Sequence, residues 1–367
     1  MIHVSAPGKL FLSGEWAILE VGNRGMVAAV DKRVHSKIEE AHEYSINIKD
    51  FDIKDLRFDF VDNKVTFSTD VMEIKDKIKF IKESIEVALR YITENGKGLK
   101  KFKIETWGEL SQIVVDGEAK KIGFGSSAAS VVAVVTSVLK LHDMNYTEDE
   151  IYKLSTIVHY YAQGKIGSAF DVAASTYGGV FVYSRFDPKW LEGKMKENIL
   201  LKNIVNDKWP GFVAEKLEVP NEFILLVGWT KKSASTSAMV KQLNQWRDNN
   251  KEKYDKQFER IALSAIGTIS TWKGNDRNEL FRHLKENETL LKDLGEMSGV
   301  DIETGDLKKL SEAAFENGGA GKLSGAGGGD CGIAICYDKA TANKIKDAWK
   351  NAGIYILDVG IDRNGVR

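Results

Sequence analysis

The stretch Ile122-Gly123-Phe124-Gly125-Ser126-Ser127-Ala128-Ala129 stands directly before an apolar run that continues to Leu141. The run has the length and character of a buried helix, and the glycines and serines form a turn at its start. Such a turn collects free backbone N–H groups at the positive end of the helix dipole, where a phosphate can bind. Serine is also an ordinary helix cap. The stretch alone therefore leaves both interpretations open.

Two familiar phosphate motifs fit the sequence poorly. A Walker A loop needs a glycine five residues before Gly-Lys, but Glu316 precedes Gly321-Lys322 at that distance and His159 precedes Gly164-Lys165. Gly123, Gly125 and Ala128 satisfy the dinucleotide pattern G-x-G-x-x-G/A, with Asp143 downstream as the acid. That acid should end a strand, whereas Asp143 lies in a polar turn before a capping box formed by Thr147 and Glu150. The dinucleotide interpretation is therefore disfavoured.

Composition excludes several classes of function. The chain has 367 residues, which allows one large domain or two, and a formal net charge of −1. A near-neutral chain gives no electrostatic reason to expect nucleic acid or an anionic membrane as a partner. The sequence has no apolar run of membrane-spanning length and no evident signal peptide. Cys331 and Cys336 are the only cysteines, and their spacing on a strand places them on opposite faces, so we expect no disulfide. We expect a cytoplasmic protein.

Hydrophobic periodicity predicts a mixed chain in three parts. Residues 1–185 contain several strands, a helix from Ile74 to Glu94 and the Gly/Ser loop with its helices. In this part the first strand should break at Pro7-Gly8, and strands 102–107 and 112–115 should pair with each other. Residues 186–220 hold three of the four prolines and are predicted to be an irregular join. Residues 221–367 should form an α+β layer in which the glycine-rich run 318–330 is a loop.

Three further features accompany the Gly/Ser loop. Lys9 follows the Pro7-Gly8 break, and Asp171 is a lone carboxylate among small residues. The run Gly318–Asp330 is too flexible to persist without a ligand or close backbone contact. Each has an ordinary alternative: a solvated lysine, a helix-capping aspartate and a mobile loop.

Together and in this order, these features resemble the three signature motifs of the GHMP kinase superfamily. The motifs correspond to Pro7-Gly8-Lys9 onward, to Gly123–Ala129 and to Lys322–Gly329, and the resemblance covers nearly the whole chain. Within the superfamily, the segments 5–15, 162–174, 228–236 and 324–332 are most similar to phosphomevalonate kinases. The resemblance implies an α+β, two-lobed GHMP kinase fold, with a ribosomal S5-like N-terminal lobe that binds ATP (residues 1–185) and a ferredoxin-like C-terminal lobe (residues 221–367).

The resemblance also implies roles for individual residues. The nucleotide phosphates would be held by Gly123, Phe124, Gly125, Ser126, Ser127 and Ala128. Ser127 would in addition be a Mg²⁺ ligand. Lys9 and Asp171 would be catalytic and would pair with each other, Lys9 neutralising the γ-phosphoryl charge. The acceptor would contact Ser168, Lys231, Ser235, Thr236, Ser324, Gly325 and Ala326, and the hydroxyls of Ser233–Ser237 could bind its phosphate.

One position departs from the mevalonate kinase pattern. Mevalonate kinases carry a glutamate, a second Mg²⁺ ligand, where this chain has His159 or Tyr160. His159 as a metal ligand is one alternative. Because Mg²⁺ prefers oxygen ligands, we expect instead that His159 is packed or hydrogen-bonded, with Mg²⁺ held chiefly by nucleotide, Ser127 and water.

The resemblance thus implies a kinase that uses ATP and Mg²⁺ to convert 5-phosphomevalonate into 5-diphosphomevalonate. The alternatives are a kinase for an alcohol such as mevalonate, homoserine or a sugar, a non-catalytic nucleotide sensor and a dinucleotide oxidoreductase. The expected partners are ATP and a small phosphorylated acceptor. The sequence does not determine the oligomeric state.

Overall fold

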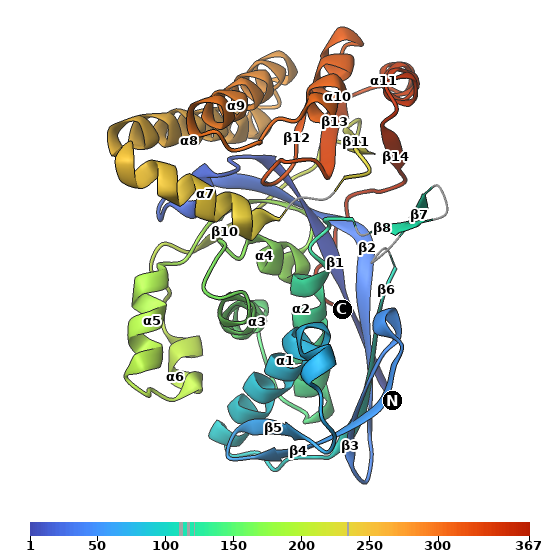
Figure 1. Cartoon of the computed structure of the whole chain (residues 1–367), viewed down its shortest axis with the longest axis vertical. Coiled ribbons are helices and arrows are strands. Elements are labelled where there is room, and N and C mark those ends of the chain that lie inside the picture. The colour runs from blue at the N-terminus through green and yellow to red at the C-terminus, as the bar shows by residue number, and fades with distance from the viewer. Residues whose placement is uncertain (110–112, 116–117, 121, 233–234) are drawn as a thin grey trace.

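The computed structural model describes residues 1–109, 113–115, 118–120, 122–232 and 235–367. Within these residues, the chain from Ile2 to Leu217 builds an eight-stranded sheet of order β10-β9-β2-β6-β3-β4-β5, with β1 also paired to β2 (Figure 1). All pairs in this sheet are antiparallel except β3 with β6. The strands are β1 (Ile2–Ser13), β2 (Gly25–Glu40), β3 (Tyr44–Ile48), β4 (Ile53–Val61), β5 (Lys64–Phe67), β6 (Phe102–Gly108), β9 (Val180–Ser184) and β10 (Val213–Leu217).

Helices cover one face of the large sheet. They are α1 (Lys75–Glu94), α2 (Ser126–Leu141), α3 (Glu148–Ala162), α4 (Phe170–Tyr177), α5 (Pro188–Lys196) and α6 (Leu201–Asn206). The helix predicted from Ile74 to Glu94 is present as α1 and buries an apolar face, and the predicted capping box of Thr147 and Glu150 begins α3. Helix α2 is buried almost all round, as its continuous apolar run requires. This helical layer places the starts of α2 and α4 beside β1.

The C-terminal part adds a second, four-stranded sheet of order β12-β13-β11-β14 among the described residues. Its strands are β11 (Ile224–Trp229), β12 (Ala320–Leu323), β13 (Cys331–Cys336) and β14 (Tyr355–Leu357). Its helices are α7 (Thr236–Asn249), α8 (Lys251–Lys273), α9 (Arg277–Ser298), α10 (Gly305–Glu316) and α11 (Lys339–Asn351). Cys331 and Cys336 are buried free thiols, as expected. The described residues thus form the α+β architecture in two parts that the sequence predicts.

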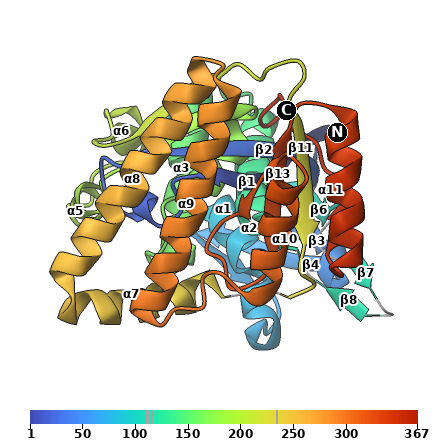
Figure 2. The same cartoon turned by 90° about the horizontal axis from the view of Figure 1, so that it is seen from above.

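A shared apolar core joins the two parts. Leu10, Leu12 and Met26 of β1 and β2 pack with Val227 and Trp229 of β11 and with side chains of α8 and α9. Helix α8 contacts both β2 and β1, and α9 lies beside α8 (Figure 2). Strands β1 and β2 are therefore covered on both faces, by α2 and α4 on one side and by the C-terminal part on the other. Among the described residues, no helix has the length and apolar character needed to cross a membrane.

The prediction of irregular structure for residues 186–220 is wrong. The segment contains α5, α6 and the edge strand β10. Pro188 occupies the first turn of α5, where a missing N–H costs nothing, and the Asp187 side chain caps this helix by accepting from Lys189 N and Trp190 N. One of the prolines that suggested a join, Pro188, thus begins a helix.

Three smaller expectations also need correction. Strand β1 continues through Pro7-Gly8 with a register shift instead of breaking there. Strand β6 joins β2 and β3, whereas β7 (Ile113–Val115) pairs with β8 (Glu118–Lys120); Gln112, included in the predicted strand, lies outside the described residues. The glycine-rich run contains β12, because its glycines let β12 and β13 pack closely beneath α10.

Candidate active site

A cavity of about 750 Å³ brings the four sequence features together. Its wall includes β1, the turn before α2, the loop from α3 to α4, the start of α7 and the loop after β12. The predicted residues on this wall are Lys9, Gly123, Gly125, Ser126, Ser127, Ser168, Asp171, Thr236, Ser324, Gly325 and Ala326. Phe124, Ala128, Lys231 and Ser235 are not on the wall.

The Gly/Ser turn begins α2 as predicted. Gly125 is the N-cap residue, with a φ of 74°, and no side chain caps the helix. Ser126 and Ser127 of this first turn line the cavity, where their backbone N–H groups can meet an anion. Ala128 is fully buried and away from the wall, so its predicted contact with phosphate is not supported. The Phe124 N–H donates to Ile122 O, and the Phe124 carbonyl accepts from Lys9 N. The backbone of Phe124 thus supports β1, and the predicted contact of Phe124 with phosphate is not supported.

Lys9 lies beside this turn without the partner predicted for it. Its Nζ donates to Gly123 O at 2.7 Å and lies 5.5 Å from the Phe170 ring centroid. No ion pair joins it to Asp171 in the described structure, so the predicted Lys9–Asp171 pair is wrong. The two side chains do approach each other across Gly125: a Cβ there would lie 3.0 Å from Lys9 Cγ and 3.4 Å from Asp171 Cβ. Gly125 therefore gives both groups access to the same end of the cavity.

Asp171 faces His159 instead. Its Oδ2 lies 3.8 Å from His159 Nε2, which is also 3.1 Å from Ser127 Oγ and 3.1 Å from Gln163 Nε2. His159 is buried and stacks on Phe80. Burial lowers the pKa of His159, against the opposing effect of Asp171, so the imidazole is neutral near pH 7. The expectation of a packed, hydrogen-bonded histidine is confirmed.

The loop after β12 is attached to β1 through Ser324. The Ser324 hydroxyl accepts from Phe11 N at 2.9 Å and donates to Phe11 O at 3.0 Å. Trp16 Nε1 donates to Ala326 O at 3.1 Å. Because the Ser324 hydroxyl is already engaged, Gly325 and Ala326 offer the more accessible surface for an acceptor.

The start of α7 forms the opposite wall. Ser235 caps this helix by accepting from Ala238 N, which is the ordinary alternative for that serine, and Lys232 pairs with Asp306 at 2.8 Å. Thr236 and Ser237 line the cavity. Ser233, included in the predicted phosphate-binding segment, lies outside the described residues. The exposed first turn of α7 is thus a second helix N-terminus at the cavity.

Among the wall residues that sequence reasoning missed, two are charged groups close to the Gly/Ser turn or on helix α1: Asp330 and Lys79. Asp330 accepts from Gly123 N at 3.0 Å, and a Cβ at Gly123 would overlap its carboxylate. Burial raises the pKa of Asp330, with Lys9 and the Gly123 N–H opposing. Lys79 of α1 adds a positive charge to the wall. The position of Asp330 at the end of the glycine run was a usable signal, whereas Lys79 is one of several lysines in its helix.

A cluster of buried charged side chains lies next to the loop that follows β12. Lys322 of β12 pairs with Glu15 and donates to Leu323 O at 2.6 Å, and both ionic side chains are almost inaccessible. Glu288 of α9 accepts from Ser311 Oγ at 2.6 Å and from Leu323 N at 3.0 Å. Burial raises the pKa of Glu288 to about 7. The cluster ties β12 to the end of β1.

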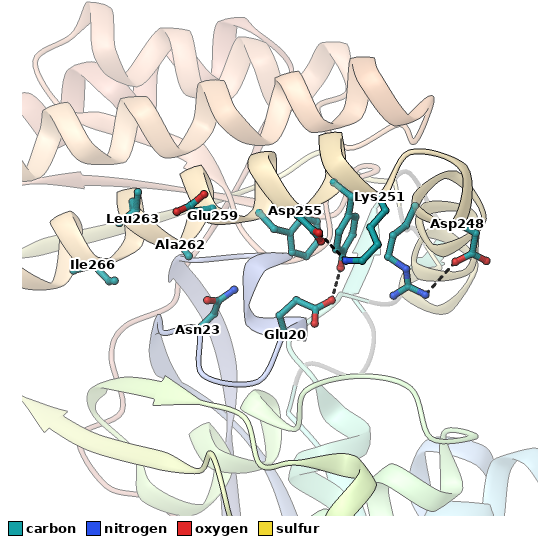
Figure 3. A pocket seen from close by; sticks show the side chains of 12 residues that line it. Glu20, Asn23, Asp248, Lys251, Asp255, Glu259, Ala262, Leu263 and Ile266 are labelled. Carbon is teal, nitrogen blue, oxygen red and sulfur yellow. Dashed lines mark hydrogen bonds and ion pairs between the residues drawn. The ribbon is translucent and has the colours of Figure 1, made fainter.

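A second cavity, of about 710 Å³, lies between the turn after β1 and helix α8 (Figure 3). Tyr254 OH donates to Glu20 at 2.7 Å, and Lys251 pairs with Asp255 at 2.6 Å. Charged side chains that line this cavity are therefore already paired with each other or hydrogen-bonded to a neighbour. Of its described residues, none belongs to the four features that meet at the first cavity.

Comparison with known families now identifies the class of protein. The chain matches the GHMP kinases N terminal domain over residues 79–179 and the GHMP kinases C terminal domain over residues 265–354, which together span more than half of it. This chain belongs to the GHMP kinases.

The similar proteins include phosphomevalonate kinases and mevalonate kinases. The chain is 27% identical to phosphomevalonate kinase of Streptomyces sp. (strain CL190), covering 96% of this chain and 95% of that protein. It is 26% identical to mevalonate kinase of Thermococcus gammatolerans, covering 100% and 98%. Its fold matches Streptococcus pneumoniae phosphomevalonate kinase in complex with phosphomevalonate and AMPPNP, with a TM-score of 0.83, 27% identity and coverage of 98% and 100%. Relatives with two different acceptors thus resemble the whole chain to a similar degree.

Proposed function

We propose that this kinase transfers the γ-phosphoryl group of ATP to 5-phosphomevalonate, giving ADP and 5-diphosphomevalonate. The observation that carries the proposal is that two helix N-termini line one cavity: that of α2, which no side chain caps, and that of α7, whose Thr236 and Ser237 line the wall although Ser235 caps the helix. One anion site would serve the ATP phosphates, and the other would serve the phosphate that the acceptor already carries. A mevalonate acceptor has no such phosphate. The Streptococcus pneumoniae relative, solved with phosphomevalonate and AMPPNP, supports this reading.

The residues suit transfer to a phosphate. The second pKa of a phosphomonoester is about 6, so the attacking oxygen is already ionised at neutral pH and needs little help from a base. The difficulty is to bring two anions together, which requires positive charge. Lys9 carries that charge, and its hydrogen bond to Gly123 O leaves further N–H donors for a phosphoryl group. The new P–O bond forms to the acceptor oxygen while the bond to the leaving ADP breaks.

Mg²⁺ would enter with the nucleotide. Within the described ranges, no cluster of acidic, histidine or cysteine side chains could hold a metal ion without other ligands. The Ser127 hydroxyl on the cavity wall supplies an oxygen ligand, which fits an ion held mainly by phosphate and water. When bound, Mg²⁺ neutralises charge on the transferring phosphoryl group. His159 keeps the Ser127 side chain oriented through their 3.1 Å contact.

An acceptor panel tests the proposal. ADP release is measured with 5-phosphomevalonate, mevalonate, homoserine and galactose at equal concentrations, with an acceptor-free control. The proposal predicts the highest kcat/KM with phosphomevalonate. Faster turnover of mevalonate would replace the proposed acceptor by the alcohol, whereas nucleotide binding without any turnover would favour a sensor.

A further inference from the structure

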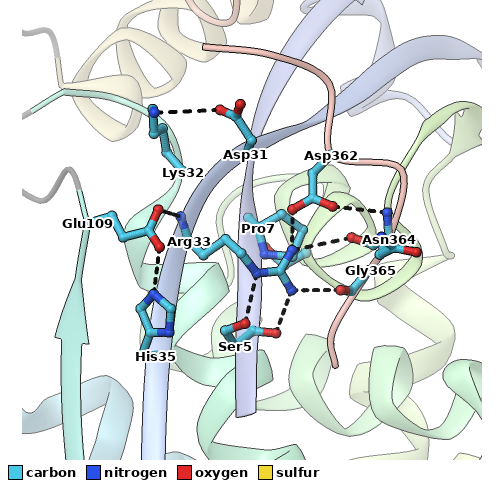
Figure 4. A network of polar contacts seen from close by, with 11 residues as sticks. Ser5, Pro7, Asp31, Lys32, Arg33, His35, Glu109, Asp362, Asn364 and Gly365 are labelled. Carbon is cyan, nitrogen blue, oxygen red and sulfur yellow. Dashed lines mark hydrogen bonds and ion pairs between the residues drawn. The ribbon is translucent and has the colours of Figure 1, made fainter. Parts of the chain in front are cut away.

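The C-terminal segment 358–367 leaves the small sheet after β14 and crosses to the large one. It meets β2, β1 and the end of α4, each through backbone hydrogen bonds. Figure 4 shows the side-chain contacts of Arg33 in the same region. The backbone hydrogen bonds are Asp31 N to Gly360 O (3.0 Å), Asp362 N to Ala29 O (3.0 Å), Gly179 N to Asp362 O (2.7 Å), Val366 N to Thr176 O (3.1 Å), Arg367 N to Ser5 O (3.0 Å) and Ser5 N to Arg367 O (2.8 Å). The segment thus touches the two elements that carry Lys9 and Asp171.

Arg33 of β2 is the centre of these contacts. Its side chain is only 4% exposed and pairs with the Asp362 carboxylate. The guanidinium also donates to Ser5 Oγ (2.8 Å), Ser5 O (2.7 Å), Gly365 O (2.8 Å) and Asn364 O (3.4 Å). A single planar group therefore fixes β1 on one side and the C-terminal segment on the other, which a lysine with one nitrogen cannot reproduce.

The register shift of β1 lies at the same point. Pro7 pairs with Arg33, but the next residue, Gly8, pairs with Val30, so β2 bulges opposite this step. Lys9 follows directly. Ser175 of α4 donates to Pro7 O at 2.7 Å, and the same helix begins beside Asp171. The bulge of β2 and the C-terminal segment thus both contact the elements that carry Lys9 and Asp171.

We propose that Arg33 is a positioning residue for phosphoryl transfer. With segment 360–367 it holds the bulge of β2 and the end of α4 in register, and so aligns Lys9 and Asp171 with the reacting phosphates. The inference rests on the proposed function only for the identity of the acceptor. Misplacement of reacting groups by about 1 Å lowers turnover by about a hundredfold. Loss of the Arg33 contacts should therefore lower kcat more than it weakens binding.

The test compares Arg33→Lys, a truncation after Arg363 and the two combined. The matched control is Arg57→Lys, since Arg57 is an exposed arginine of β4 that pairs with Glu43. Folded fraction is measured by circular dichroism and thermal unfolding. Then kcat and both KM values are measured per folded molecule, with whichever of phosphomevalonate and mevalonate the wild type uses. Failure of the proposed acceptor therefore leaves this test intact.

We expect Arg33→Lys and the truncation each to lower kcat about tenfold or more, with both KM values within about twofold of wild type. The kcat of the combined variant should be little lower than the kcat of either single variant, because both changes break the same network of contacts. The truncated protein keeps Arg33 and Asp362 and gives the same readout if Arg33→Lys does not fold. The proposal would be overturned by an unchanged kcat in the folded fraction, or by failure of all three variants to fold. It would also be overturned if the fold-loss of kcat in the combined variant equalled the product of the two single losses.

Discussion

Replacing Glu288 with glutamine should remove a pH dependence of stability that the wild-type protein shows. Burial raises the pKa of Glu288 from 4.5 to about 7, with Lys322, Ser311 Oγ and Leu323 N opposing and Glu303 reinforcing the effect. The folded protein then holds this proton more tightly than the unfolded chain does. The contribution of this proton to the free energy of unfolding is complete below about pH 4.5 and is lost as pH rises through about 7. At about 1.4 kcal/mol per pKa unit, the full effect is about 3 kcal/mol.

Urea unfolding followed by tryptophan fluorescence at about pH 5 and about pH 8 measures this effect. Between these values, wild type should lose about 2.5 kcal/mol relative to Glu288→Gln. The glutamine can still accept from Leu323 N. The control is Glu296→Gln on the same helix, where Glu296 is exposed and pairs with Lys292 at 3.5 Å. Parallel pH profiles for wild type and Glu288→Gln would refute the assignment of a raised pKa to this buried carboxyl.

Further predictions concern the cavity. Ser127→Ala should weaken Mg–ATP use about tenfold or more in kcat/KM, and unchanged ATP kinetics would remove Ser127 from the nucleotide site. Lys9→Met should lower kcat more than Asp171→Asn, both by large factors of about a hundred or more, and the opposite order would make Asp171 a general base and favour an alcohol acceptor. Thr236→Val should raise the acceptor KM several-fold more than the ATP KM. Ser235→Ala should mainly destabilise α7, by about 1 kcal/mol. If both changes had equal effects on the acceptor KM, a phosphate site at Thr236 would be contradicted.

Features that depend on neighbouring residues were predictable from the sequence. The apolar face of α1, the capping box of α3 and the Gly/Ser start of α2 all follow from side chains a few positions apart. The same local reasoning failed for residues 186–220, because Pro188 is compatible with both a loop and the first turn of a helix. The Asp187 cap beside it was the available signal.

Contacts between distant segments could not be derived from local pattern. The Ser324 hydroxyl binds Phe11, and Arg33 binds Asp362, in each case more than 300 positions away in the chain. Lys9 binds Gly123 O rather than Asp171 because β1 approaches the Gly/Ser turn directly, with Lys9 N on Phe124 O. Motif order placed the right segments at the cavity, but the partner of each side chain depends on the register of β1 against its neighbours.

The most direct measurement of the central claim is ³¹P NMR of the products formed from ATP and 5-phosphomevalonate. Our account predicts that the phosphomonoester resonance of the acceptor disappears and that a coupled pair of diphosphate resonances from 5-diphosphomevalonate appears beside those of ADP. An unchanged phosphomevalonate resonance, together with formation of a new phosphomonoester when mevalonate is supplied instead, would contradict it.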